Sequence, residues 1–160
     1  MIRATDGGRN PKLMVSGFQL EEIGSESVSP FRSWAEDPAQ GLTAGVNDGP
    51  LDDHDLDGLL NLMEFVLRGN PLVPASATLP TVSPSGEAWV FDYERSNLSE
   101  PPATTQVVEY GSDLVGWTPV SIPLTSAGIV TITPGSPSDH VSVALPNLGS
   151  TGFARLRVSE

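Results

Sequence analysis

Oxygen-bearing side chains recur at short intervals between Asp53 and Glu64 in this 160-residue chain. Asp53, Asp55 and Asp57 occupy alternate positions, and Gly58 follows them directly. Short acidic side chains at alternate positions of a tightly curved loop can all point inward. Glycine permits the sharp turn because its φ can be positive without a clash. Like charges this close together repel one another, so the spacing predicts that a cation lies among them.

When Asp53 is counted as the first position, the stretch matches the EF-hand calcium loop at every ligand position. The expected ligands are Asp53, Asp55, Asp57, the backbone carbonyl of Leu59, Asn61 and Glu64. This set supplies the hard oxygen atoms that Ca²⁺ prefers. Leu60 is expected to anchor the loop to the core. The sequence therefore predicts a calcium ion as cofactor.

Two other interpretations of the acidic stretch are open. It could be a solvated acidic turn before a helix, since Asp-Gly turns and acidic helix starts are common. Such a turn does not require Asn61 and Glu64 in register. A zinc site would use His54, but a single histidine is a weak ligand set for zinc.

Two helices are expected around this loop. The first is a short helix after Ser29, with Ser29 as N-cap, Pro30 in the first turn and Pro38 as a stop. The second is the apolar run 59–69, in which Gly69 suits the left-handed position after a helix. Apolar residues occupy almost the whole circumference of this helix, so we expect other parts of the protein to pack against both of its sides. Gly45, Gly49 and Pro50 interrupt the approach to the loop, so no helix is expected to enter it.

The rest of the chain favours short strands. Trp89, Phe91 and Tyr93 alternate with polar or smaller residues, and period-two runs recur near 105–110, 128–133, 140–145 and 153–158. We expect a mainly β fold with a small α part, an antiparallel β-sandwich or roll preceded by the calcium loop and one exit helix. Residues 1–28 would form a remnant strand (12–23) and linker from an upstream domain. Residues 29–72 would form the helical calcium-loop segment, 73–86 a proline-rich connector, and 87–160 the β domain.

The composition limits the partners. The net charge of −12 repels nucleic-acid phosphates and favours cations. The chain has no cysteine, which excludes disulfides and thiolate zinc sites. No apolar run is long enough to span a membrane, and the first residues show no signal peptide. These features predict either a cytoplasmic protein or the tail of a longer exported chain.

Four stretches together resemble a recurring C-terminal module of large exported proteins from environmental bacteria. They are "FRSWA" (31–35), "DHDLDGLLNLMEFVLRGNP" (53–71), "GSDLVGWTPV" (111–120) and "FARLRV" (153–158). The acidic loop by itself is similar to those of dockerin and thrombospondin type 3 modules. Arg68 and Leu60 depart from the usual small residues of the family pattern, and neither is a ligand. The resemblance implies a non-catalytic appendage located outside the cell or on its surface.

The expected function is therefore a calcium-dependent structural module of an exported protein, and not an enzyme. Its partners would be the calcium ion and a cell-surface polymer or another domain of the parent protein. The alternative is a calcium-stabilised carbohydrate-binding sandwich that uses Trp34, Trp89, Trp117, Tyr93 and Tyr110 as a stacking platform. A hydrolase built on Asp139 and His140 is disfavoured, because the G-x-S-x-G motif is missing and adjacent strand residues face opposite ways.

Overall fold

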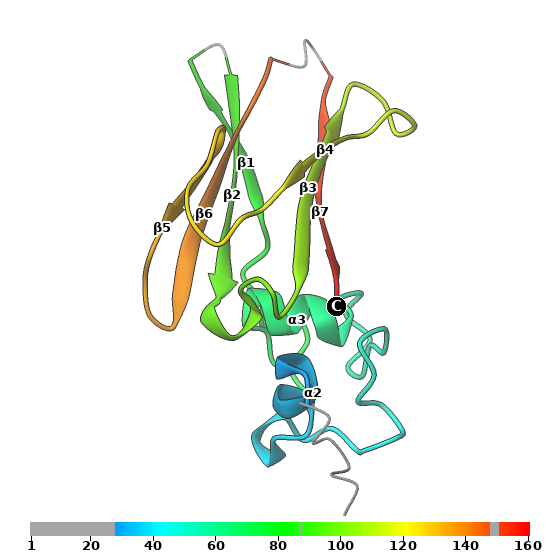
Figure 1. Cartoon of the computed structure of the whole chain (residues 1–160). Helices are drawn as coiled ribbons and strands as arrows, with labels where there is room; N and C mark the ends of the chain where they lie inside the picture. The colour runs from blue at the N-terminus through cyan, green and yellow to red at the C-terminus, as the bar shows by residue number, and fades with distance from the viewer. Residues whose placement is uncertain (1–27, 87, 148–150) are drawn as a thin grey trace, which may run out of the picture.

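The computed structural model describes residues 28–86, 88–147 and 151–160. The chain is mainly β, with two antiparallel sheets and a small helical part (Figure 1). The strand expected at 12–23 lies outside the described residues.

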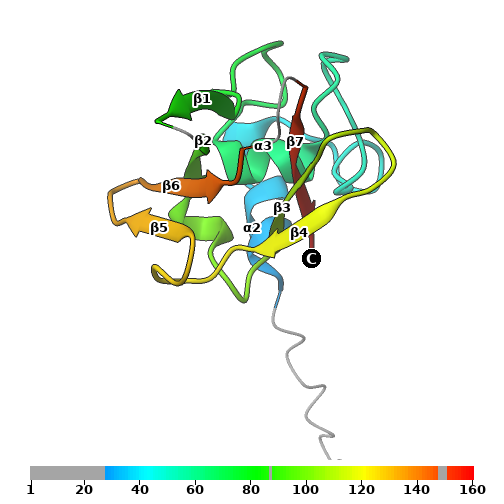
Figure 2. The same cartoon turned by 90° about the horizontal axis from the view of Figure 1, so that it is seen from above.

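The two sheets face each other as a sandwich, which is seen end-on in Figure 2. One sheet has the order β1-β2-β6-β5 and the other β4-β3-β7, and all pairs are antiparallel. The strands are β1 (Thr81–Ser85), β2 (Ala88–Ser96), β3 (Thr105–Gly111), β4 (Thr118–Ser121), β5 (Val130–Thr133), β6 (Ser138–Leu145) and β7 (Phe153–Ser159).

Alternating residues of the central strands fill the space between the sheets. Phe91 and Tyr93 of β2 are buried, and so are Val141, Val143 and Leu145 of β6. Phe91 pairs with Val143 across the two strands. The period-two pattern in the sequence is confirmed here, because every second side chain of a strand points to the same face.

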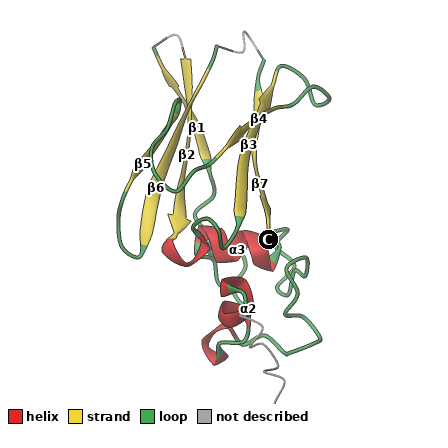
Figure 3. Ribbon diagram, in the orientation of Figure 1, coloured by secondary structure: helices red, strands yellow, loops and turns green. Residues whose placement is uncertain are grey.

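The helices gather at one end of the sandwich (Figure 3). They are α2 (Pro30–Ala35), the 3₁₀ turn η2 (Pro38–Gln40) and α3 (Asn61–Leu67), and a further 3₁₀ turn, η3 (Asn97–Ser99), follows β2. Ser29 caps α2 as expected, because its hydroxyl accepts a hydrogen bond from the Arg32 N–H at 3.1 Å.

Helix α3 lies between α2 and the sandwich, so it is covered on almost all sides as the sequence predicted. On one side, the ring of Phe65 contacts Phe31 and Trp34 at centroid distances of 5.8 and 5.5 Å. On the other side, the helix joins the same buried cluster as Phe91. A single hydrophobic core therefore runs from α2 through α3 into the sheets.

Three details differ from the sequence-based expectations. The expected connector at 73–86 contains β1, which pairs with β2 although every residue of β1 is exposed. Strand β4, which includes Pro119, was not predicted. The left-handed residue at the end of α3 is Arg68, with φ of 59°, and not Gly69. Gly69 is explained by a contact with Glu64 that is described below.

The start of α2 lies beside the end of β7. The Ser29 hydroxyl donates a hydrogen bond to Oε1 of Glu160 at 2.8 Å. The two ends of the described module are therefore adjacent, although 131 positions separate them in sequence.

Candidate metal centre

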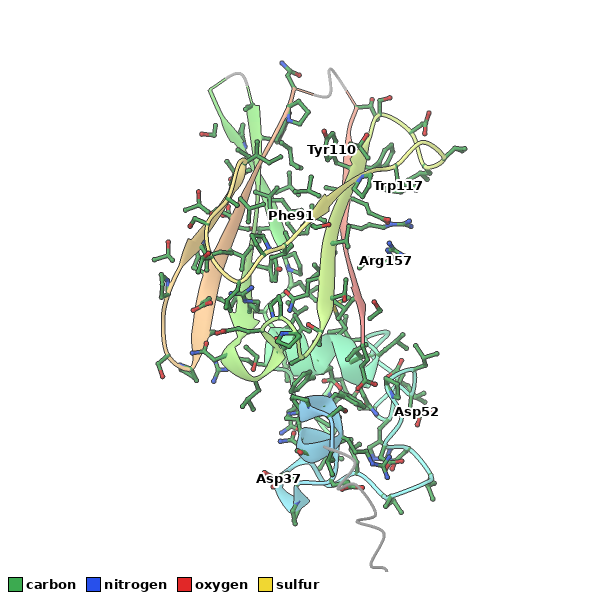
Figure 4. All side chains as sticks on the ribbon, viewed as in Figure 1. Asp37, Asp52, Phe91, Tyr110, Trp117 and Arg157 are labelled. Carbon is green, nitrogen blue, oxygen red and sulfur yellow. The ribbon has the colours of Figure 1, made fainter. Side chains whose placement is uncertain are left out.

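The acidic stretch forms an irregular loop that leads directly into α3. Residues 41–60 contain no helix, so the loop has an exit helix and an irregular entry. Asp52, at the start of the stretch, lies in the loop region beside the helical end of the molecule (Figure 4). The loop is therefore continuous with α3, and most residues of α3 are buried in the core.

Asp53, Asp55 and Asp57 converge. One carboxylate oxygen from each lies within 4.8 Å of the other two. Hydrogen bonds inside the loop impose this curvature: the Gly58 N–H donates to Asp53 Oδ2 at 3.0 Å, and the Leu59 N–H donates to Asp57 Oδ1 at 2.8 Å. Gly58 has a φ of 94°, which an L side chain rarely adopts.

Several side-chain oxygens of the loop and of α3 are buried and have no hydrogen-bond partner. They are Asp53 Oδ1, Asp55 Oδ2, Asn61 Oδ1 and Glu64 Oε1. Buried polar atoms are nearly always paired, because leaving one unpaired costs roughly 1–3 kcal/mol. These atoms are all acceptors, so either a hydrogen-bond donor or a cation would satisfy them.

Glu64 comes from α3 and is not one of the three carboxylates that converge within 4.8 Å, but it lies close enough to them for their charges to act on it. Its side chain is 1% exposed. Its pKa is raised to about 7, mainly by burial and in smaller part by the charges of Asp55, Asp57 and Asp53. The aspartates and Glu64 therefore share one electrostatic environment in which every ionised group opposes the others.

Gly69 makes room for the Glu64 carboxylate. A Cβ atom at position 69 would lie 2.8 Å from Glu64 Oε1 and 3.1 Å from the Cβ of Ala77. The connector after α3 also touches the loop, because the Ala75 N–H donates to Asp57 Oδ2 at 2.6 Å. Sequence reasoning missed both contacts, since neither glycine nor alanine carries a ligand signal.

Asn61 connects the entry segment to α3. Its Nδ2 donates to the carbonyls of Asn47 and Gly49 at 2.9 and 3.0 Å, and this holds the entry segment against the start of α3. Its Oδ1 is left buried and unpartnered. The sequence assigned Asn61 only to the metal, because its backbone partners lie 14 and 12 positions earlier.

Leu59 and Leu60, which directly precede α3, differ in exposure. Leu59 is half-buried, and its N–H donates to Asp57. Leu60 was expected to anchor the loop, and this is wrong, because its side chain is 39% exposed. Leu60 is the extended N-cap residue of α3, so the buried face of the helix begins one residue later.

His54 lies apart from the carboxylate cluster. Its Nδ1 is 2.6 Å from Nδ2 of Asn47 on the entry segment. The entry segment is also fixed by Asp48, which pairs with Nη1 of Arg32 at 3.0 Å. The converging groups are therefore oxygens alone, which is the donor set of a hard cation such as Ca²⁺ rather than zinc.

The aromatic residues of the carbohydrate interpretation do not form one surface. Tyr93 is 3% exposed, and its hydroxyl donates to Oε1 of Gln106 at 2.7 Å inside the sandwich. Trp34 packs against Phe65 below α3. The ring of Trp117 is covered by the guanidinium of Arg155, at 4.1 Å from the ring centroid.

Asp139 and His140 have separate partners on the two faces of their sheet. Asp139 is buried and accepts a hydrogen bond from Nη2 of Arg95 at 2.6 Å. The ring of His140 contacts Glu94 and Asp92 on the outer face. The two side chains therefore do not face each other, as expected for neighbours on a strand.

No protein-family model, curated protein or solved structure matches the chain. Among the described residues, no helix has both the length and the apolar character needed to cross a membrane.

Proposed function

We propose that this chain is a non-catalytic calcium-binding structural module, in which one Ca²⁺ joins the loop 53–58 to α3. The supporting observation is the set of buried, unpartnered oxygens of Asp53, Asp55, Asn61 and Glu64. The ligands would be Asp53, Asp55, Asp57, the Leu59 carbonyl, Asn61 and Glu64.

The metal would contribute to folding rather than to signalling. Helix α3 is part of the continuous core, so a cation that holds Glu64 against the loop also holds the loop against the sandwich. If the free calcium concentration is about 100 times the dissociation constant, the folded state gains roughly 2.7 kcal/mol. Loops of this kind in extracellular modules bind calcium at about 10⁻⁴ to 10⁻³ M, so calcium-rich surroundings outside a cell suit this site.

We place the module in an exported or cell-surface protein, where it would stiffen its part of the chain and contact a surface polymer or a neighbouring domain. The acidic composition supports this location, because it favours divalent cations over nucleic acid. Fractionation of cells that express the parent protein tests the location independently of calcium binding.

Thermal unfolding with calcium and with a chelator tests the metal site. We expect a clear fall in Tm on chelation, restored by added Ca²⁺ but not by an equal concentration of Zn²⁺. The Asp55→Asn variant should lose most of this response. Asp37→Asn is the matched control, because Asp37 is an exposed acid that caps η2, and asparagine can also cap. A Tm unaffected by chelation, together with no heat on titration of Ca²⁺, would refute the proposal.

A further inference from the structure

Strand β7 is the least protected edge of the two sheets. The other edge strands are short or contain proline: β1 carries Pro84, β4 has 4 residues with Pro119, and β5 has 4 residues. Strand β7 has 7 residues and neither proline nor glycine. Within the described ranges it pairs with β3 alone. Long, regular edges present unpaired N–H and C=O groups to any extended chain.

The charged residues of β7 do not guard this edge. Nε of Arg155 donates to Oε2 of Glu109 on β3 at 2.8 Å, and its guanidinium lies over Trp117. Nε of Arg157 lies 3.2 Å from Oε1 of the same Glu109. Both side chains therefore lean over the outer face of their own sheet, where Figure 4 shows Arg157 and Trp117. Among the described residues, the backbone of β7 makes no backbone hydrogen bond outside its pairing with β3.

An apolar groove of ≈ 290 Å³ runs beside this edge, between β7, β1 and α3. Its lining includes Leu59, Met63, Leu67, Leu79, Val82 and Leu156. Leu79 and Val82 are 55% and 46% exposed, so the groove presents apolar surface to solvent. A strand added to β7 would continue the alternation of the sheet and place every second side chain over this groove.

We propose that the β7 edge and the groove bind an extended polypeptide segment of a partner protein by strand addition. The segment has apolar residues facing the groove and acidic residues on the alternate positions. Backbone hydrogen bonds to β7 supply affinity, and the groove selects the apolar side chains. Arg155 and Arg157 share the single carboxylate of Glu109, so the outer face of β7 has surplus positive charge that attracts acidic neighbours.

Charge argues against a second copy of this chain as the occupant. Pairing two β7 strands would bring the arginine pairs of both copies onto one face, where like charges destabilise cross-strand pairs. An acidic segment of another protein would instead place opposite charges beside Arg155 and Arg157, which stabilises cross-strand pairs.

The test is a titration of the full calcium-loaded chain with a synthetic peptide of about ten residues that alternates valine and glutamate. Amide NMR shifts and hydrogen exchange locate the bound peptide. We expect protection of amides along β7 and unchanged exchange along β4 and β5. A peptide alternating valine and lysine should bind at least about tenfold more weakly.

Two variants separate the charge from the groove. Arg157→Glu should reverse the preference between the two peptides. Leu79→Ser should weaken both peptides, whereas Leu124→Ser, at a site that is 50% exposed and is not among the groove-lining residues, should leave binding unchanged.

Four results would overturn the proposal: unchanged β7 amides, equal affinity for both peptides, dimers of the free protein that protect the β7 amides, or binding that appears only after removal of residues 1–27. The last two would assign the edge to a second copy or to this chain's own N-terminal segment.

Discussion

A methyl group on Gly69 would lie 2.8 Å from Oε1 of Glu64 and 3.0 Å from its Cβ. The backbone of Gly69 does not adopt a positive φ; Arg68 does so instead. The glycine is therefore required by the carboxylate that lies against it, and the end of α3 and the candidate metal centre form a single structural unit.

Replacing Gly69 with alanine should displace the Glu64 carboxylate and weaken calcium binding by about tenfold, or ~1.4 kcal/mol. Isothermal titration with Ca²⁺ measures this. Gly116→Ala is the matched control, because its new Cβ would lie 3.6 Å from Asp113, an ordinary contact. Equal calcium affinity in Gly69→Ala and the wild-type protein would show that Glu64 is not a ligand.

Asn61→Asp separates the hydrogen bonds of Asn61 to the entry segment from its proposed role as a metal ligand. The substitution keeps an oxygen for the metal but removes both N–H donors to the carbonyls of Asn47 and Gly49. We expect a loss of stability of roughly 2 kcal/mol in calcium-free protein, because two half-buried carbonyls lose their partners. Urea unfolding in a chelator measures the loss. An unchanged midpoint would mean that the entry segment is held by other contacts.

The pKa of Glu64, raised to about 7 mainly by burial, gives calcium-free protein a defined pH dependence. Between the ordinary value of 4.5 and about 7, the native state keeps a proton that the unfolded chain has released. Stability should therefore fall as pH rises through this window.

Urea unfolding in a chelator across this pH range, compared with Glu64→Gln, measures the effect, because the variant lacks this titration. With saturating Ca²⁺ the trend should weaken or reverse, since the metal binds the deprotonated form. Parallel pH profiles for the wild type and the variant would contradict the assignment.

The buried pair of Arg95 and Asp139 should be intolerant of single substitutions. Arg95 is 0% exposed, and it also donates from Nη1 to the Pro123 carbonyl at 2.9 Å. Removing Asp139 alone as Asp139→Leu leaves an uncompensated buried charge, at a cost of about 3–5 kcal/mol.

The double variant Arg95→Met/Asp139→Leu should be more stable than the Asp139→Leu single variant, because no charge is then left unpaired. Denaturant midpoints of both variants test this. A double variant less stable than the single one would assign the main role to the hydrogen bonds of Arg95 with the backbone.

Elements with a strong local signal were predictable from the sequence. The period-two strands of β2 and β6 and the Ser29 cap carry their own patterns, and the structure contains them. Strands β1 and β4 carry no such pattern. Each includes a proline, and all five residues of β1 are exposed, so only their pairing partners define them.

The oxygen-bearing residues of the candidate site could be listed from the sequence, because all of them fall between Asp53 and Glu64 at the spacing of a known calcium loop. The supporting contacts of the site could not be predicted in this way. The Asn61 bonds to the entry segment, the Ala75 bond to Asp57 and the space left at Gly69 join segments whose proximity appears only after folding.

The hydrogen bond between Ser29 and Glu160 has a practical consequence for protein engineering. Because the module's first helix and last strand meet at one corner, both ends could be spliced into a single surface loop of a host protein without stretching either chain. An insertion of this kind would leave the two flanking residues of the host close together while the inserted module folds.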